Sequence, residues 1–458
     1  MGRFRLFAGI ALLIVGGLVV FSSYFIGGRI EQRFSDVCSD EAAWASRTQL
    51  SCEEVDYNRG WFSSNATTRI TARGTESPAL VLRHSIRHGP LSMHKDYILG
   101  LSRVQTVGEL EHGNATSPLR TAFQYKTPLR ATTFVGLDSS VRSRIHSPGD
   151  EWQSGDRKFA WGGMNGTVTL LRSSKRGMDL DFQFPQMEID VPGRTGDLLL
   201  KDLRISRKVR RNQQGGMING TAELRMERIE AHGSQVGEVS AESLAMSSQT
   251  DRSGDLLRSK TEIGLKQGRF GEVAIEQGDF RMLLDSLDAE ALRQWRTLLR
   301  QAPEEMQDRR IRGIAKRFLA SSPRMDKAKL RVETGEGEIR MDTSAAFNGT
   351  GELPAPGSPA MLKRLSARTR LSVPVSIGVR IATVPVAFLQ GLTSGLSSSA
   401  NSEEMERRAR DWLEKLRQLQ YISRDSGSYA VDVKLEEGLV SVNDKPVLPI
   451  GGLMMQSE

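Results

Sequence analysis

The sequence predicts a mainly β (α+β) protein, in which a single N-terminal transmembrane helix is followed by large antiparallel, hairpin-rich curved sheets with a few inserted helices. Three observations predict this fold class. Residues 6–26 carry no charge, short runs of alternating apolar and polar residues recur between glycines, and only two later regions have helical spacing. With 26% charged and 38% hydrophobic residues, the chain of 458 residues has a globular composition. We therefore expect most of it to fold.

The uncharged stretch from Leu6 to Ile26 predicts a membrane span. Its 21 residues form a helix long enough to cross the hydrocarbon core at about 1.5 Å per residue. The segment ends with bulky aromatic residues and is followed by Gly27-Gly28-Arg29, without a small-x-small site for a signal peptidase, so it is predicted to stay as an anchor. Residues 1–5 are basic and contain no acid, which favours a cytoplasmic tail. The expected location is the bacterial inner membrane, single-pass, with the bulk of the chain in the periplasm.

The two cysteines, Cys38 and Cys52, lie just beyond this anchor. An even count, a short separation and an oxidising compartment favour a disulfide that closes a small loop. Two free buried thiols, or a metal pair that lacks its other ligands, are the alternatives.

Residues 27–285 are predicted to form a β-rich periplasmic domain. Residues 221–227 place apolar side chains on one face and charges on the other, which is typical of a half-buried antiparallel strand. The same alternation recurs at residues 197–206, 330–334, 338–347 and 429–435. Asn165-Gly166, Asn219-Gly220 and Asn348-Gly349 are each predicted to mark a tight turn into a strand, and their uneven spacing argues against a solenoid.

Two helical regions interrupt the β pattern. Residues 288–319 have apolar residues at helical spacing, with Pro303 starting a second helix, so residues 286–325 are expected to form a helical hairpin. Residues 326–458 are expected to form a second β-rich region, which holds a helix at 403–419 and a closing hairpin that turns near Glu437-Gly438. The apolar segment 373–396 contains an arginine and two prolines, which favours a strand and a short helix over a second span.

The net charge is +8, and basic residues gather before a glycine-containing loop, at Arg204, Arg207, Lys208, Arg210 and Arg211. In an exported protein such a patch would meet anionic lipid head groups, lipopolysaccharide phosphates or cell-wall polymers rather than nucleic acid. The alternative interpretation is a solvated strand end with exposed arginines.

The sequence contains no recognisable catalytic constellation, and it predicts no cofactor and no metal site. His84 and His88 would lie about 13 Å apart along a strand, too far for one metal ion. Ser92 and Lys95 match a Ser-x-x-Lys pattern, but the companion motifs of serine enzymes of that kind are missing, so the match is attributed to chance. We therefore expect a protein that is not an enzyme.

Several phrases resemble the YdgA-like family of bacterial inner-membrane proteins. They are Tyr57-Asn58-Arg59-Gly60-Trp61-Phe62-Ser63-Ser64 after a single anchor, His88-Gly89-Pro90, the stretch 280–295, and the closing hairpin from Val433 to Asn443. The resemblance runs in order along nearly the whole chain. It implies an inner-membrane protein with a large periplasmic part that self-associates, and it carries over no catalytic residue. The cysteines are not part of the resemblance.

From the residues themselves we expect Arg59-Gly60 to be a turn or bulge that needs glycine, followed by Trp61 in the core or, alternatively, docking a partner. Two functions are expected. The first is a membrane-tethered, non-enzymatic scaffold or adaptor for envelope proteins, which self-associates as a homo-oligomer. The second is a binder or carrier of lipid or lipopolysaccharide-type ligands on a concave, apolar sheet face.

Overall fold

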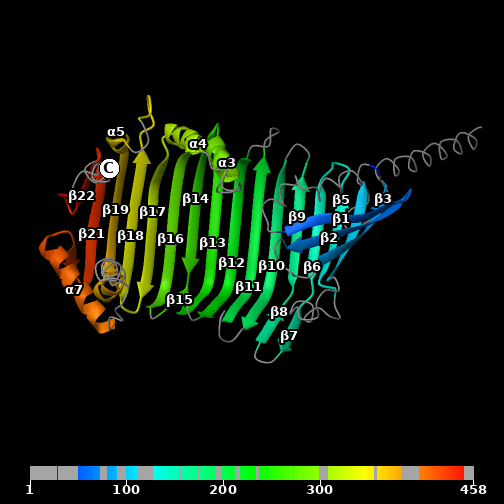
Figure 1. Cartoon of the computed structure of the whole chain (residues 1–458), viewed down its shortest axis with the longest axis horizontal. Helices are drawn as coiled ribbons and strands as arrows, with labels where there is room; N and C mark the ends of the chain where they lie inside the picture. The colour runs from blue at the N-terminus through cyan, green and yellow to red at the C-terminus, as the bar shows by residue number, and fades with distance from the viewer. Residues whose placement is uncertain are drawn as a thin grey trace, which may run out of the picture. The chain divides into compact units, whose positions relative to one another are not determined.

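The computed structural model confirms a mainly β protein built on large antiparallel sheets with few helices (Figure 1). The described residues are 28, 50–72, 80–89, 100–110, 127–154, 157–172, 176–190, 197–211, 217–233, 237–271, 273–298, 308–354, 358–382 and 402–447. The chain divides into two compact units between Val236 and Gly237. The predicted helical hairpin therefore lies within the second unit, between strands of its sheet.

The predicted anchor at residues 6–26 lies outside the described residues, as do Cys38, Pro90, Ser92, Lys95 and Pro303. No helix in the described part of the chain is long and apolar enough to span a bilayer. Cys52 lies on the first strand, opposite Ile70. Its pairing with Cys38 stays a prediction, and so does the membrane anchor.

The first unit contains twelve strands among its described residues. They are β1 Leu50–Arg59, β2 Ser63–Ala72, β3 Leu80–His88, β4 Ser102–Leu110, β5 Leu129–Val135, β6 Val141–Ser147, β7 Asp150–Ser154, β8 Arg157–Trp161, β9 Met164–Leu171, β10 Gly177–Asp190, β11 Asp197–Arg211 and β12 Met217–Gly233. Strands β1 to β6 pair consecutively and antiparallel, β6 then pairs with β9, and β9 to β12 continue in order. The short hairpin β7–β8 attaches to the end of β10.

One row across this sheet is apolar; its members share a face because residues directly opposite each other on paired strands do so. The row that contains Phe182 continues through Ile205 to Leu224 on one side and through Gly166 to Ile145 on the other. A Cβ on Gly166 would lie 2.3 Å from the Phe182 ring, so glycine makes room for the aromatic side chain. Phe182 also stacks on Phe184, with ring centroids 6.1 Å apart.

The second unit contains eleven strands and, besides a short helix at residues 375–382, four helices among its described residues. They are β13 Gly237–Ser253, β14 Leu256–Leu265, β15 Gln267–Phe270, β16 Val273–Asp288, α3 Ala289–Leu298, α4 Asp308–Ala320, β17 Arg324–Thr334, β18 Gly337–Phe347, α5 Pro359–Leu362, β19 Leu365–Pro374, α7 Ser402–Gln418, β20 Ser423–Asp425, β21 Ser428–Glu436, β22 Leu439–Val442 and β23 Lys445–Val447. The main sheet runs β13–β14–β16–β17–β18–β19–β21–β22–β23, entirely antiparallel. The strands predicted from alternation are confirmed.

Both predicted helical regions are confirmed, and each packs around a small core. Helices α3 and α4 bury Ala291, Leu298 and Ile314 against each other. Helix α7 buries Ala409 and Leu413 against Val379 and Ala382, which belong to a short helix at residues 375–382. This short helix follows β19 directly, so the start of the 373–396 segment is a strand and a helix, as predicted. The closing hairpin β21–β22 turns at Glu437 and Gly438, both with positive φ.

The prediction that each Asn-Gly pair marks a turn into a strand is wrong. Asn165-Gly166 lies inside β9 and Asn219-Gly220 inside β12, paired with neighbouring strands, while Asn348-Gly349 follows β18 instead of preceding a strand. None of these residues has a positive φ. Asn165-Gly166 pairs with strands on both sides, which supply the backbone hydrogen bonds that a local turn would otherwise provide.

Candidate ligand-binding surfaces

The family-type residues Tyr57–Ser64, His88 and Gly89 converge on one corner of the first unit. Gly60 N–H donates to the Ser63 carbonyl at 2.8 Å, and His88 N–H donates to the Phe62 carbonyl at 2.7 Å. Ser64 Oγ and His88 Nε2 lie 2.7 Å apart and are both buried. Gly89 has a φ of 115°, which only glycine adopts without strain. The two phrases therefore form a single structural corner although they are far apart in sequence.

Further polar contacts lie on β2, β3 and β4, on the same face as the contact between Ser64 and His88. His84 Nε2 lies 3.0 Å from Thr68 Oγ1, and His84 Nδ1 lies 2.9 Å from Thr106 Oγ1. Burial lowers the pKa of His84 to about 4. Burial, and then the Arg59 charge, lower the pKa of His88. Both imidazoles are thus neutral at pH 7, with hydroxyl partners, which is the pattern of structural histidines.

The expected turn at Arg59-Gly60 is confirmed, but the reason for its glycine and the expected core position of Trp61 need correction. Gly60 has no positive φ; instead, a Cβ there would lie 2.6 Å from the Ser63 carbonyl oxygen, so the turn has no room for a side chain. Trp61 is 56% exposed and Phe62 is 52% exposed, so neither is a core residue. They lie in the turn between β1 and β2, beyond the ends of both strands.

The basic stretch 204–211 lies on β11, and strand alternation divides it between the two faces. Arg204, Lys208 and Arg210 lie on the polar face, whereas Arg207 and Arg211 lie on the other. Arg204 pairs with Asp202 at 3.0 Å and lowers the pKa of that carboxyl, and Arg210 pairs with Asp179. The five side chains do not form one patch.

A larger basic surface lies on β2–β6, where sequence reasoning did not find it. We call it the arginine face; its members are Arg69, Arg83, Arg87, Arg103, Arg130, Arg142 and Arg144. Arg87 lies opposite Arg103, Phe134 lies between Arg103 and Arg142, and Val107 lies between Arg83 and Arg130. Glu109 is the only acidic residue on these five strands. Counting charges strand by strand, with alternation, could have found this face.

In the second unit, one face of the sheet carries a continuous row of seven apolar side chains, which we call the apolar row. It consists of Met246, Ile263, Phe280, Leu330, Met341, Leu371 and Val431, each opposite the next. At ~4.8 Å between neighbouring strands, the row is about 29 Å long. Met246 is 40% exposed, and the other six are partly accessible rather than buried. The two buried apolar clusters of this unit lie among its helices, not on this row.

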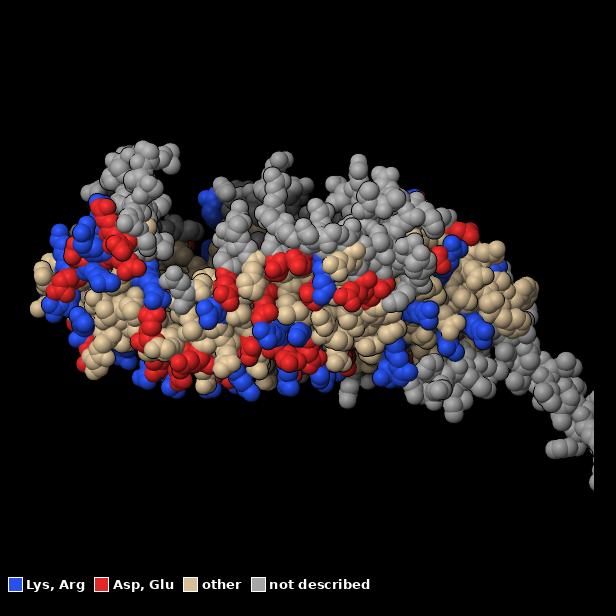
Figure 2. Space-filling model, turned by 90° about the horizontal axis from the view of Figure 1, so that it is seen from below, with Lys and Arg blue, Asp and Glu red and all other residues tan. Residues whose placement is uncertain are grey.

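The opposite face of the same strands is charged. Its central row, which we call the charged row, consists of Glu262, Arg281, Lys329, Asp342, Arg370 and Asp432. Neighbours in the row form ion pairs: Lys329 with Asp342 at 3.4 Å, and Arg370 with Asp432 at 3.4 Å. Figure 2 looks along the strands and shows acidic and basic side chains next to one another along one margin of the molecule.

Two hollows lie along these strands. One, of about 520 Å³, is lined by Asp342, Arg370 and Asp432 and also by four residues of the apolar row, Leu330, Met341, Leu371 and Val431. Another, of about 570 Å³, is lined by five basic residues, one acid and two apolar residues: Arg258, Lys260, Arg281, Lys327, Lys329, Asp251, Met282 and Leu283. The first hollow therefore combines charged and apolar lining residues.

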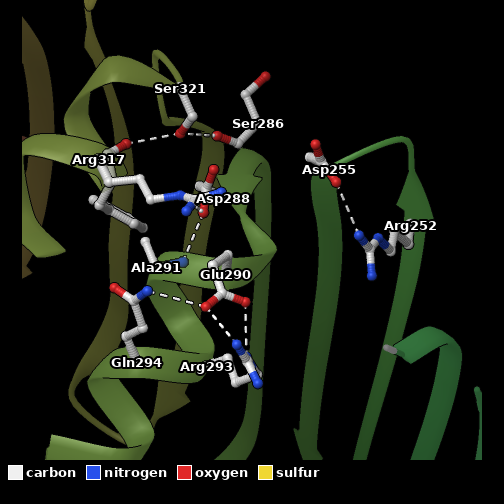
Figure 3. Close-up of polar contacts among 11 residues, drawn as sticks. Arg252, Asp255, Ser286, Asp288, Glu290, Ala291, Arg293, Gln294, Arg317 and Ser321 are labelled. Atoms are coloured by element: carbon white, nitrogen blue, oxygen red, sulfur yellow. Dashed lines mark hydrogen bonds and ion pairs between the residues drawn. The ribbon is translucent and has the colours of Figure 1, made fainter. Parts of the chain in front are cut away.

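A third polar cluster surrounds Asp288 where β16 leads into α3 (Figure 3). The Ala291 N–H donates to Asp288 Oδ1 at 2.6 Å, and Arg317 Nε donates to the same oxygen at 3.0 Å. Asp288 thus caps α3 and ties it to α4, which is a structural role. No group of His, Cys, Asp and Glu residues within the described ranges could hold a metal ion.

Comparison with known proteins identifies the family of this chain. No curated protein matches the chain in sequence. The model of one family, described as "Bacterial protein of unknown function (DUF945)", matches residues 5–449, nearly the whole chain. The chain therefore belongs to the DUF945 family of bacterial proteins of unknown function.

Proposed function

We propose that the protein binds the acyl chains of lipids or lipopolysaccharide-type amphiphiles along the apolar row of its second unit. The observation that carries this proposal is the partial exposure of a continuous apolar row on a sheet whose other face is charged. Ordinary soluble proteins rarely expose a contiguous apolar surface, and where they do it is commonly a binding site.

The physical fit of an acyl chain follows from the shape of the row. The apolar side chains lie side by side across seven strands, so an extended hydrocarbon chain could contact all of them at once. Burial of apolar surface supplies roughly 25 cal/mol per Å² and requires no specific hydrogen bond. A second row on the same face, through Met282, Ala328 and Thr343, is also free of charged residues. The apolar row would therefore recognise the hydrocarbon chain of a ligand rather than its polar head group.

We further propose that the predicted anchor at residues 6–26 tethers this unit to the bacterial inner membrane, with the sheets in the periplasm. The uncharged span and its basic, acid-free flank support this placement. A tethered protein with an apolar row could accept amphiphiles close to the membrane that contains them.

Photocrosslinking tests the acyl-chain site. A photoreactive residue placed at Met341 should form lipid adducts in cells, detected by mass spectrometry, because Met341 lies on the apolar row. The same residue placed at Asp342 is the matched control, since this neighbour lies on the opposite face. Equal lipid adducts at both positions, or none at Met341, would contradict the proposal.

A scaffold or adaptor role is the second candidate, and one observation favours it. Among the described strands, β1 pairs only with β2, so one edge of this ten-residue strand is without a described partner. Such an edge can add a strand from another protein or from a second copy of this chain. A photoreactive residue at the exposed Glu53 should then yield protein adducts, including a homodimer, and their absence would contradict this role.

A further inference from the structure

We propose that the first unit binds an anionic amphiphile, with its hydrocarbon chain on the apolar side of β6 and β9–β12 and its acidic head group on Arg207. This site lies in a different unit from the apolar row, so either site can exist without the other. Two observations carry the proposal. They are three rows of uncharged residues and the one guanidinium that lies among them.

Three consecutive rows of five residues cross β6, β9, β10, β11 and β12 on one face, and we call them the Arg207 surface. The rows are Ile145, Gly166, Phe182, Ile205 and Leu224, then Ser143, Val168, Leu180, Arg207 and Ala222, and then Val141, Leu170, Met178, Val209 and Gly220. Val209 is buried, and all the others except Arg207 are partly accessible. At ~4.8 Å between neighbouring strands, each row is about 19 Å long.

Arg207 is the only charged residue of the Arg207 surface, and its side chain is exposed. Its neighbours across the strands, Leu180 and Ala222, are apolar. Its neighbours two residues away on β11, Ile205 and Val209, are apolar as well. Within the described part of the chain, Arg207 forms no ion pair.

The other face of β11 shows how arginines on this strand are usually neutralised. Arg204 pairs with Asp202 at 3.0 Å, and Arg210 pairs with Asp179 across the strands. The three rows around Arg207 contain no acid at all. The protein therefore neutralises the arginines of the polar face itself and leaves Arg207 open to an anion from outside.

The guanidinium decides which kind of amphiphile can cover the apolar rows. Apolar contact favours any hydrocarbon chain in proportion to the area that it buries. A neutral ligand would remove water from Arg207 without replacing its hydrogen bonds, and an unpaired charge without water is costly. A phosphate or carboxylate head group would instead accept two parallel, charge-assisted hydrogen bonds. The Arg207 surface should therefore prefer an anionic amphiphile to a neutral one.

The spacing of the rows suits a ligand with both parts. The Arg207 row lies two residues from the Phe182 row, about 6.6 Å along the strands, which a long arginine side chain can reach across. The Phe182 row carries the large apolar side chains, and its Gly166 leaves room for the Phe182 ring, since a Cβ there would lie 2.3 Å from it. A hydrocarbon chain along the Phe182 row would thus begin beside its head group at Arg207.

Photocrosslinking of the full chain in phosphatidylcholine nanodiscs tests the proposal. Two probes carry the same diazirine-bearing acyl chains: phosphatidic acid, which is anionic, and diacylglycerol, which is neutral. Mass spectrometry of the peptides should show several-fold more adducts of phosphatidic acid than of diacylglycerol on β10 and β11. Arg207→Gln should reduce the phosphatidic acid adducts to the diacylglycerol level, whereas Arg207→Lys should keep most of them. Equal labelling by the two probes, or labelling that Arg207→Gln leaves unchanged, would overturn the proposal.

Arg204→Gln is the matched control, because Arg204 lies on the opposite face of the same strand. It should keep the wild-type labelling, and melting curves check that all three variants fold. If Arg204→Gln lowers the labelling as much as Arg207→Gln does, general charge attraction explains the result and the assignment to Arg207 is wrong. Adducts on β18 of the second unit are read in the same spectra, so failure of the Arg207 surface is distinguishable from failure of the apolar row.

Two further probes identify the source of the anion. A diazirine-bearing palmitic acid tests a carboxylate head group, and its labelling of β10 and β11 should also depend on Arg207. Inorganic phosphate at the concentration of the phosphatidic acid probe should not displace that probe, because it lacks a hydrocarbon chain. If it does displace the probe, Arg207 binds soluble anions and the assignment to an amphiphile is wrong.

Discussion

Gly60 shows how one missing methyl group permits a turn. Its Cβ position lies 2.6 Å from the Ser63 carbonyl oxygen, the same oxygen that accepts the Gly60 N–H hydrogen bond. Any other residue would push the two apart and break this bond. This turn also positions the Phe62 carbonyl to accept a hydrogen bond from the His88 N–H. The steric requirement at Gly60 is therefore linked to the pairing of β2 with β3.

Gly60→Ala should therefore destabilise the first unit by about 1–3 kcal/mol, the usual cost of forcing an atom into occupied space. Urea denaturation and hydrogen exchange of the β2 amides would measure this. Gly264→Ala is the control, since the atom nearest to a Cβ there is 4.0 Å away. The control should stay within about 0.5 kcal/mol of the wild type. An equal effect of the two substitutions would argue against the steric explanation.

His84 makes the stability of the first unit depend on pH. Its pKa is lowered from 6.5 to about 4 in the folded protein, so within this window the unfolded chain binds a proton that the folded site excludes. The free energy of unfolding should thus fall as the pH drops through the window, with no contribution from His84 to the slope above it. Urea denaturation at a series of pH values measures this.

His84→Gln should flatten that dependence, because glutamine keeps hydrogen-bonding capacity without taking up a proton. His146→Gln, at an exposed position on β6, is the matched control and should keep the wild-type profile. If the two variants show the same slope, another group dominates the acid sensitivity.

At the scale of elements, the junction between β16 and α3 depends on one carboxylate. Asp288 is 9% exposed, caps α3 through the Ala291 N–H and accepts from Arg317 on α4. Nearby, Asp255 pairs with Arg252 at 3.0 Å, but its side chain is 80% exposed (Figure 3). Both aspartates accept from an arginine, but only Asp288 is buried and caps a helix, so the pair separates the contribution of a buried cap from that of an exposed ion pair.

Asp288→Ala should cost about 2 kcal/mol, since it removes a cap and leaves Arg317 without this partner. Asp255→Ala should cost less than about 1 kcal/mol, because exposed ion pairs contribute little. Hydrogen exchange of the α3 amides should show the difference directly. Similar protection of α3 in both variants would mean that Asp288 does not hold the helix in place.

Period-two alternation in the sequence was sufficient to find β11, β12, β17, β18 and β21, and helical spacing was sufficient to find α3, α4 and α7. The features that these two patterns did not predict depend on contacts between segments that are far apart in the sequence. Asn165-Gly166, for example, lies within β9 because β-pairing on both sides outweighs its turn propensity. The arginine face was missed because its residues come from five strands, and only the register shows that they share a face. Asp202, Ser243 and Ser286 adopt positive φ inside strands, which no local pattern indicates.

For the whole molecule, the expected topology has its own test. A reporter that is active only in the periplasm, fused after Glu458, should be active, and one that requires the cytoplasm should be silent. The reason is the uncharged span at residues 6–26, preceded by arginines without an acid. Activity of the cytoplasmic reporter would contradict the membrane orientation, and with it the periplasmic location of both units.

The strict separation of the apolar row from the charged row also affects how the second unit reaches its fold. If one strand paired one residue out of register, its charges would move into the apolar row and its apolar side chains would move among charges. On β18, for example, Asp342 would then lie next to Leu330 and Leu371 instead of between Lys329 and Arg370. Such mispaired intermediates are penalised as soon as they form. The two rows therefore disfavour pairings that are shifted by an odd number of residues, and so protect the sheet against register errors during folding.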